Sequence, residues 1–187
     1  MNVLQGIRVI DVTQNIAGPH STQTLADLGA DVIKIEPPGG DPTRTWGPPF
    51  WKGEAPLFLA YNRNKRSVVL DLKSDAGREA LWRLIDSADV FVQAYRASVI
   101  EKLGFSYEQV RQRRPGIIYA SVTGYGSKGP LAQRPGYDPL IQAFSGMMSL
   151  TGHPDGPPAR VGGSVVDVGT GILTALGILA ALRGRDQ

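Results

Sequence analysis

Apolar and polar residues alternate along the chain in two patterns, one typical of strands and one typical of helices. Five short runs rich in β-branched residues predict strands, at 7–11, 32–36, 67–72, 89–95 and 116–122. Segments with helical spacing of apolar residues lie between several of these runs. Strands that alternate with helices predict a parallel, layered α/β fold, because each connecting helix packs back onto the sheet.

The segment between the first two strands predicts a helix. Residues 21–30 place Leu25 and Leu28 at helical spacing, and Gly29 can end the helix in the left-handed conformation. The first part of the chain therefore predicts a strand-helix-strand unit.

Two further helices are predicted from their start signals. Ser74 is a candidate N-cap for a helix over 74–88. Ser106 and Gln109 have the spacing of a capping box, and Pro115 would stop the helix that they open.

The second half of the chain contains two loops rich in glycine and proline, at 123–138 and 151–164. Residues 139–150, between the loops, predict a helix. The apolar run at 171–182 predicts a buried helix that ends at Gly184, and it is shorter than the ~20 residues that cross a bilayer. No repeat or linker divides the chain, so we expect one domain.

The composition excludes several classes of function. The chain has 187 residues, 42% hydrophobic and 20% charged, as in ordinary globular proteins. A net charge of +3 mildly favours anionic partners, but the basic residues form no run, so nucleic acid is not indicated. The absence of cysteine excludes disulfides and a thiolate nucleophile, and two histidines without ligand spacing argue against a metal site. With no secretory signal in view, we expect a cytoplasmic protein that does not bind membranes.

Asp167 is the sharpest candidate for chemistry. It lies between a strand-like segment and an apolar helix predicted to begin near Val168. A helix N-cap is the commoner role for an aspartate in this position, and a covalent nucleophile is the alternative. Four nearby glycines would leave room for a bulky substrate and could offer backbone N–H donors to an oxyanion: Gly162, Gly163, Gly169 and Gly171.

Two other features could bind phosphate. The loop between the first strand and the following helix can present backbone N–H groups to an anion such as a diphosphate. Lys65, Arg66 and Lys73 lie at the two ends of the third predicted strand, where they could bind phosphates or simply face solvent. The literal GxGxxG at 124–129 is not expected to bind a dinucleotide, because Pro130 follows it and no helix opens there.

Several segments taken in order resemble the family III CoA-transferases, which include formyl-CoA and carnitine CoA-transferases and α-methylacyl-CoA racemases. The matching elements are AGP at 17–19, LADLGADVIKIEPPGGD at 25–41, NKRSVVLDLK at 64–73, ADVFVQAY at 88–95, GYG at 124–126, RPGYD at 134–138, GPP at 156–158 and the segment around Asp167. The resemblance implies a Rossmann-like layered α/β fold with a mainly parallel sheet. It further implies that residues 1–187 form the N-terminal portion of a truncated large CoA-binding domain, without the small domain, and that the full-length protein is an interlocked homodimer.

The resemblance also implies the reaction. Such an enzyme moves coenzyme A from an acyl-CoA thioester to a free carboxylic acid through a covalent intermediate on Asp167, with the CoA thioester as substrate and with neither a tightly bound cofactor nor a metal. Residues matching the thioester site are Gln14, Asn15, Ile16 and Ala17, and Tyr137 also falls at the substrate. Those matching the nucleotide site are Leu70, Lys73, Tyr95 and Lys102.

Departures from the family pattern narrow the expected substrate and reaction. Ile16 and Ala94 replace the glutamine and asparagine of formyl-CoA transferase, which argues against formyl and oxalate specificity. Tyr137 replaces the histidine base of the racemases, and tyrosine is a poor base near neutral pH, so transfer is favoured over racemisation. Family members continue beyond residue 187, so a non-catalytic CoA-binding fragment is the alternative to an active transferase, and a racemase-like isomerase is a further one.

Overall fold

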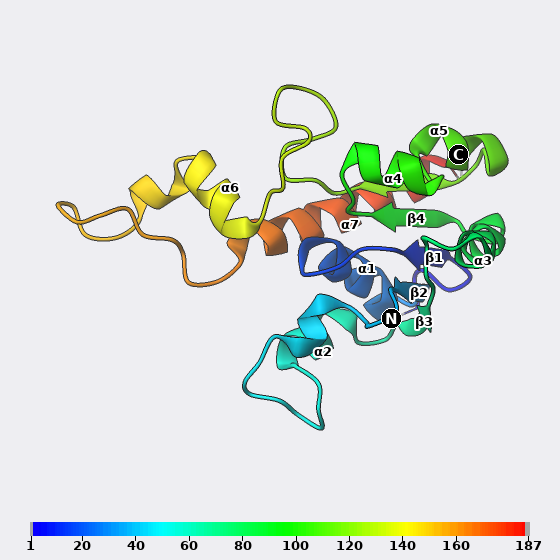
Figure 1. Cartoon of the computed structure of the whole chain (residues 1–187), viewed down its shortest axis with the longest axis horizontal. Coiled ribbons are helices and arrows are strands. Elements are labelled where there is room, and N and C mark those ends of the chain that lie inside the picture. The colour runs from blue at the N-terminus through cyan, green and yellow to red at the C-terminus, as the bar shows by residue number, and fades with distance from the viewer. Residues whose placement is uncertain (1, 186–187) are drawn as a thin grey trace.

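A computed structural model of the chain describes residues 2–185 and contains a five-stranded parallel sheet (Figure 1). The strands follow the order β3-β2-β1-β4-β5 across the sheet. They are β1 Arg8–Asp11, β2 Asp31–Glu36, β3 Arg66–Val69, β4 Val90–Gln93 and β5 Ile118–Ser121. All five predicted strands and the predicted α/β class are thereby confirmed.

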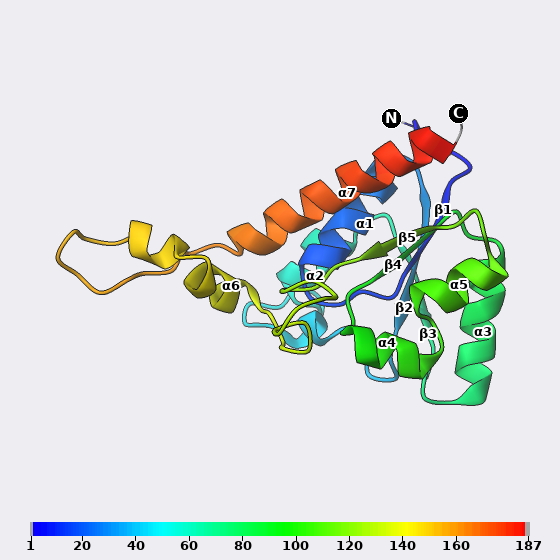
Figure 2. The ribbon, with the colours of Figure 1, turned by 90° about the horizontal axis from the view of Figure 1, so that it is seen from above.

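Helices cover both faces of the sheet, which gives three layers (Figure 2). One face carries α1 Ala17–Asp27 and α7 Val165–Arg185, and the other carries α3 Asp75–Asp86, α4 Ala97–Leu103 and α5 Tyr107–Arg113. The short η1 Pro42–Thr45 and α2 Pro56–Asn62 lie between β2 and β3 in the chain. A parallel sheet covered on both faces explains why its strands are nearly continuous apolar runs.

Alternate residues of the central strands supply two separate cores. Ile10, Ile33 and Phe91 pack with the α3 and α5 side of the molecule, whereas Val9 and Val32 pack with α1 and α7. This division follows from the two-residue period of a strand, which sends neighbouring side chains to opposite faces.

The predicted helix boundaries hold at three places. The Ser74 side chain accepts the N–H of Gly77, and Ser106 and Gln109 form the reciprocal capping box. Gly29 follows α1 at a φ of +101°, in the left-handed region. The start of α1 is different: it begins at Ala17, four residues before the expected start.

The last helix departs from the sequence expectation. It runs from Val165 to Arg185, so it begins before Val168 and passes through Gly184. Only one stripe of it is buried, formed by Gly171, Ala175, Ile178 and Leu182. The expectation of a buried helix is therefore wrong for its other faces, where Ile172, Leu173 and Leu176 are exposed. The reason is that this helix packs along a single face on α1 and the sheet, which covers about a third of its circumference.

By length and composition alone α7 could cross a membrane, although a core helix passes the same test. The helix has 21 residues and extends beyond the apolar run of 171–182 at both ends. The reasoning that it was too short to span a bilayer is therefore wrong.

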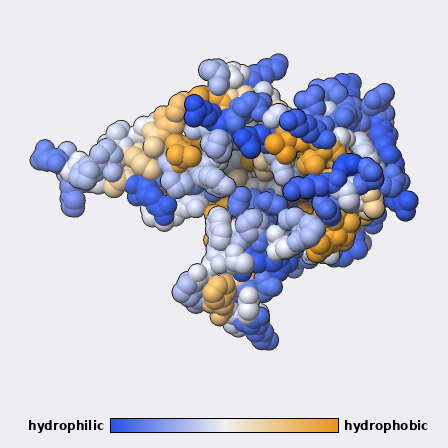
Figure 3. Space-filling view, viewed as in Figure 1, coloured by the Kyte–Doolittle hydropathy of each residue, from blue (hydrophilic) through white to orange (hydrophobic). Residues whose placement is uncertain are grey.

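An arm extends from the body between β5 and α7 (Figures 1 and 2). It contains α6 Asp138–Phe144 and the short η2 Met147–Leu150, separated by Gly146 at a φ of +80°. The single helix predicted over 139–150 is thus wrong, because the left-handed residue breaks it. Apolar surface is visible on the arm around α6 (Figure 3), where Leu140 and Phe144 are exposed.

Replacement by alanine is expected to have opposite effects on stability at two glycines of α7. A Cβ on Gly171 would lie 2.9 Å from the Ala17 carbonyl oxygen and 2.8 Å from the His20 Nδ1, so Gly171→Ala should push α7 away from α1. Gly177 has no atom within 4 Å of that position. We expect Gly171→Ala to lower the free energy of unfolding by about 1–3 kcal/mol, and Gly177→Ala to raise it by about 0.5–1 kcal/mol through helix propensity. Urea denaturation followed by circular dichroism measures both, and equal effects of the two variants would show that the helix contact is not tight.

Candidate active site

A pocket of about 520 Å³ lies at the carboxyl ends of the strands. Its wall includes the loop after β1, the residues that follow β4 and β5, and the first turn of α7. In an open α/β sheet, ligands bind at this edge, because the loops there converge from several strands. The space-filling view shows the surface hollowed between the base of the arm and the body (Figure 3).

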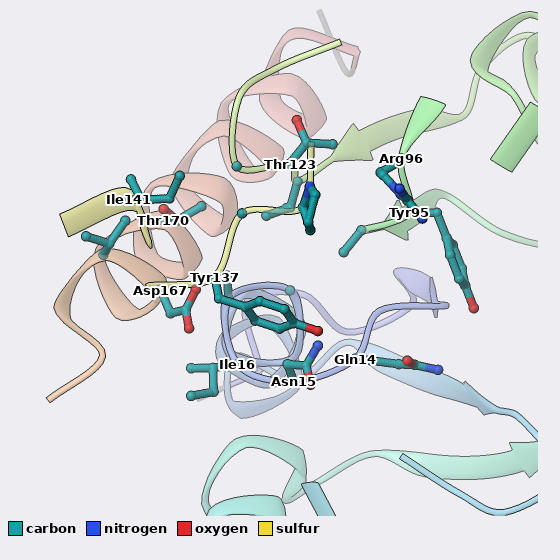
Figure 4. Close-up of a pocket in the computed structure, with 18 of the residues that line it drawn as sticks. Gln14, Asn15, Ile16, Tyr95, Arg96, Thr123, Tyr137, Ile141, Asp167 and Thr170 are labelled. Carbon is teal, nitrogen blue, oxygen red and sulfur yellow. The ribbon is translucent and has the colours of Figure 1, made fainter. Parts of the chain in front are cut away.

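Asp167 is the only carboxylate among the residues described that line this pocket. It is the third residue of α7 and is half-buried, and its side chain lies beside Tyr137 and Ile16 (Figure 4). Gln14, Tyr95 and Arg96 lie toward the opposite end of the pocket. Burial and the neighbouring charge of Asp138 raise the pKa of Asp167 to about 6.

The N-terminus of α7 is capped by Asp138 rather than by Asp167. The Asp138 Oδ2 accepts the backbone N–H groups of Val166 and Asp167 at 2.8 and 3.1 Å, and the Asp138 side chain is buried. The N-cap role considered for Asp167 is therefore wrong, because a carboxylate from α6 already occupies those donors. This leaves the Asp167 carboxylate to face the pocket.

Gln142, one turn after Asp138 on α6, is fully buried and completes this contact. Its side-chain N–H donates to Asp138 Oδ1, and its Oε1 accepts the N–H of Val161 at 2.9 Å. The pair Asp138 and Gln142 thus fastens the arm to the start of α7.

The structure brings most of the sequence-predicted site residues together. Those that line the pocket with Asp167 are Gln14, Asn15, Ile16, Ala17, Tyr95 and Tyr137. Three others lie outside its wall: Leu70 packs against the core on the α3 side, Lys73 is exposed, and Lys102 borders a shallow depression with Trp82. The roles assigned to all of them stay predictions.

A comparison with protein families shows which family the chain belongs to. The model of CoA-transferase family III matches residues 4–187. The chain belongs to this family.

Relatives and solved structures agree with this family III assignment. Succinyl-CoA:glutarate CoA-transferase of Mus musculus is 44% identical over 99% of this chain and 43% of its own length. Succinate–glutarate CoA-transferase of Agrobacterium fabrum is 48% identical over 96% of this chain and 46% of its own length. The crystal structure of a CAIB/BAIF family protein from Brucella suis superposes with a TM-score of 0.95 at 44% identity, covering 99% of this chain and 50% of that one. The chain therefore spans about half the length of the relatives it matches.

The glycines that line this pocket are not the ones expected from the sequence. Gly162, Gly163, Gly169 and Gly171 do not line it, and Gly171 instead serves the contact with α1. Gly124 and Gly136 do line it, and a Cβ on Gly124 would lie 2.7 Å from the Gly136 Cα. The glycines of the GYG and RPGYD motifs are thus needed where two loop backbones touch in the pocket wall.

Two cations at β3 are engaged in ion pairs, and the phosphate-binding expectation is wrong for Lys65, because its side chain is buried. Lys65 is buried and donates to Asp11 Oδ2 at 3.0 Å and to the Pro19 carbonyl at 2.9 Å. Arg66 pairs with Asp31 on the neighbouring strand β2. Burial outweighs attraction by Asp11 and lowers the pKa of Lys65 to about 8.

Lys65 belongs to a buried ionic network beneath the loop that carries Gln14 to Ala17. Asp11 also accepts the N–H of Thr13 at 2.9 Å, and Lys34 Nζ donates to the Thr13 carbonyl while pairing with Asp41. Both ion pairs are almost fully buried, with exposures of 2% or less. The lysines of the IKIE and NKRS motifs therefore hold the pocket loop from below.

The sequence analysis assigned no site role to three polar residues that line the pocket wall: Arg96, Arg134 and Thr170. Asp138 appeared within the RPGYD motif without a role. The available signal was the position of this motif, because a polar residue just after a glycine-rich loop often caps the helix it opens or a neighbouring one.

Glu36 extends this network, because its Oε2 accepts the backbone N–H of Asp41 at 2.8 Å, and it makes the fold sensitive to acid. Burial raises its pKa, but hydrogen bonds from Arg44 and Ser67 outweigh this and lower the pKa to about 2, from 4.5 for the free side chain. Its stabilising contribution is therefore complete above pH 4.5 and is lost as the pH falls toward 2. We expect Glu36→Gln to lower the free energy of unfolding at pH 7 by about 2 kcal/mol and to flatten its decline between these pH values.

Urea denaturation across this pH range tests the contribution of Glu36. Glu79→Gln, which removes an exposed carboxylate on α3, is the matched control and should leave the curve unchanged. A wild-type slope retained by Glu36→Gln would contradict the assignment.

Proposed function

We propose that this protein is a CoA-transferase that moves coenzyme A from an acyl-CoA to a free carboxylic acid through a covalent intermediate on Asp167. The observation that carries the proposal is the position of Asp167 as the sole carboxylate in the described pocket wall of a family III CoA-transferase. A carboxylate can attack a thioester and form an intermediate that keeps the free energy of the thioester bond.

The proposed steps balance without any other reagent. An Asp167 oxygen attacks the thioester carbonyl and expels the CoA thiolate, which leaves an acyl-aspartyl anhydride. The thiolate then attacks the aspartyl carbonyl, which releases the donor acid and forms an aspartyl-CoA thioester. The acceptor carboxylate attacks this thioester to give a second anhydride and free thiolate, and attack of the thiolate on the acceptor carbonyl forms the new acyl-CoA and restores Asp167.

The raised pKa of Asp167 suits this chemistry. With a pKa of about 6, the carboxyl is mostly ionised at pH 7, yet it is more basic than an ordinary aspartate. Greater basicity favours nucleophilic attack, provided the carboxylate remains ionised. The half-buried position also limits access of water, which would hydrolyse the anhydride.

The start of α1 is the proposed source of oxyanion donors. The N–H groups of Val166 and Asp167 already donate to Asp138, so they are not available to the tetrahedral intermediate. Ala17 and Gly18 line the pocket at the N-terminus of α1, and no side chain caps that end. Their N–H groups carry the positive end of the helix dipole toward the pocket.

A small dicarboxylic acid is the proposed acceptor. The named relatives act on succinate and glutarate, and another, from Acetobacter aceti, is an acetyl-CoA:oxalate CoA-transferase. Arg96 and Arg134 line the pocket and form no ion pair within residues 2–185. They offer positive charge for a second carboxylate.

Asp167→Asn should abolish covalent capture of substrate. Incubation with succinyl-CoA followed by denaturing mass spectrometry should show an adduct on the wild-type protein and at least a 10³-fold slower formation in the variant, because the amide is a far weaker nucleophile. Asp155→Asn removes an exposed carboxylate from the arm and is the matched control. An adduct that forms equally fast in Asp167→Asn would exclude this residue as the nucleophile.

CoA binding separates a transferase from a CoA-binding fragment without turnover. Calorimetry should show that Asp167→Asn binds CoA within about threefold of the wild-type affinity, since the carboxylate is proposed to act at the thioester rather than on the nucleotide. Binding by the wild-type protein without any adduct would support the non-catalytic alternative. Deuterium exchange at the α-carbon of 2-methylacyl-CoA would instead favour a racemase.

A further inference from the structure

We propose that Asp138 is a positioning residue for the CoA-transferase reaction, which fixes the Asp167 carboxylate in the pocket and keeps it basic. This inference rests on the proposed function of Asp167. It starts from a feature that Asp167 alone does not explain: a second carboxylate, 4% exposed, whose hydrogen bonds reach the backbone of the nucleophile itself.

The hydrogen bonds of Asp138 define where Asp167 lies. The first N–H groups of a helix have no partner inside the helix, and an unsatisfied first turn frays. Asp138 Oδ2 accepts two of these groups in α7, including the N–H of Asp167. Since the Asp167 backbone is held in this way, its side chain has few directions available and remains turned toward the pocket (Figure 4).

Asp138 is itself held in place. Gln142 donates to its second oxygen and is tied through Val161 to the segment that leads into α7. Both side chains are buried, so their hydrogen bonds are protected from competing water. The same pair therefore attaches the arm and sets the geometry of the nucleophile.

The charge of Asp138 acts on the same carboxylate. The ionisable groups of the pocket wall and of the elements packed at the start of α7 are His20 on α1, Tyr95 and Arg96 after β4, Arg134 and Tyr137 on the loop before α6, and Asp138 on α6. Of these, Asp138 is the one whose charge shifts the pKa of Asp167, and it shifts it upward, after burial. Helix dipoles lower the pKa of a carboxylate in the first turn, so the charge of Asp138 opposes the effect of α7.

Asp138→Asn removes the negative charge but keeps an acceptor for α7. The amide oxygen can still accept the N–H groups of Val166 and Asp167, whereas the new NH2 group cannot accept from Gln142 as Oδ1 does. We expect the titration midpoint of Asp167, measured by carbon-13 NMR of the side-chain carboxyl, to fall from about 6 by about one pH unit. Asp167→Asn identifies the resonance, and Asp155→Asn is the control for loss of a distant negative charge. A midpoint unchanged in Asp138→Asn would overturn the electrostatic part of the proposal.

Gln142→Leu tests positioning with the charge of Asp138 still present. Loss of the Gln142 hydrogen bonds should slow adduct formation from succinyl-CoA by about 10- to 100-fold, because a misplaced nucleophile rarely reaches the thioester. The pH dependence of adduct formation should keep its wild-type midpoint. An unchanged rate in a folded Gln142→Leu protein would overturn the positioning role, and this variant also serves if Asp138→Asn does not fold.

The two proposals fail in different ways. If the wild-type protein forms no adduct, the function assigned to Asp167 is wrong, while the NMR titration still reports whether Asp138 controls its pKa. If the adduct forms but the Asp138 and Gln142 variants leave both pKa and rate unchanged, the function stands and the role of Asp138 does not.

Discussion

The close packing of α7 on α1 is the contact on which the site depends. The two helices come from opposite ends of the chain, and Gly171 allows the α7 backbone to approach Ala17 and His20. One turn before Gly171 on the same helix lies Asp167, so the contact that completes the core also places a carboxylate beside the loop after β1. Core packing and the geometry of the candidate site are thus set by one interface.

Buried charge supports the opposite wall of the pocket. Asp11 and Lys34 contact the backbone of Thr13 at the start of the loop that presents Gln14 to Ala17, and Lys65 contacts the Pro19 carbonyl in the first turn of α1. Burying ammonium groups is costly unless each has several partners, and here each lysine has both a carboxylate and a carbonyl. These contacts keep the loop ordered, and a flexible loop at this position would misplace the substrate.

The two carboxylates at the start of α7 have different environments and different tasks. Asp138 is buried among N–H donors, whereas Asp167 has the pocket in front of it and no such donors. Two acids of the same chemical type thereby take different roles because of their surroundings, which is a recurrent way for proteins to separate a structural from a reactive group. Helix capping and nucleophile placement are then parts of one arrangement.

The sequence by itself determined the sheet, the main helices and the family. The β-branched runs, the cap at Ser74 and the capping box at Ser106 are local signals, so neighbouring residues suffice to specify them. Asp167 also stood out locally, and the ordered motifs predicted which residues would surround it. Only the tertiary structure decided what Asp138, Lys65 and Gly171 do. The contacts that define their roles, to Val166, Asp11 and Ala17 respectively, reach 28 or more residues along the chain and form only when the helices and loops pack. The sequence could not show for the same reason that one face of α7 is exposed. The residue type tells that a side chain is apolar, but its burial depends on which elements pack against it.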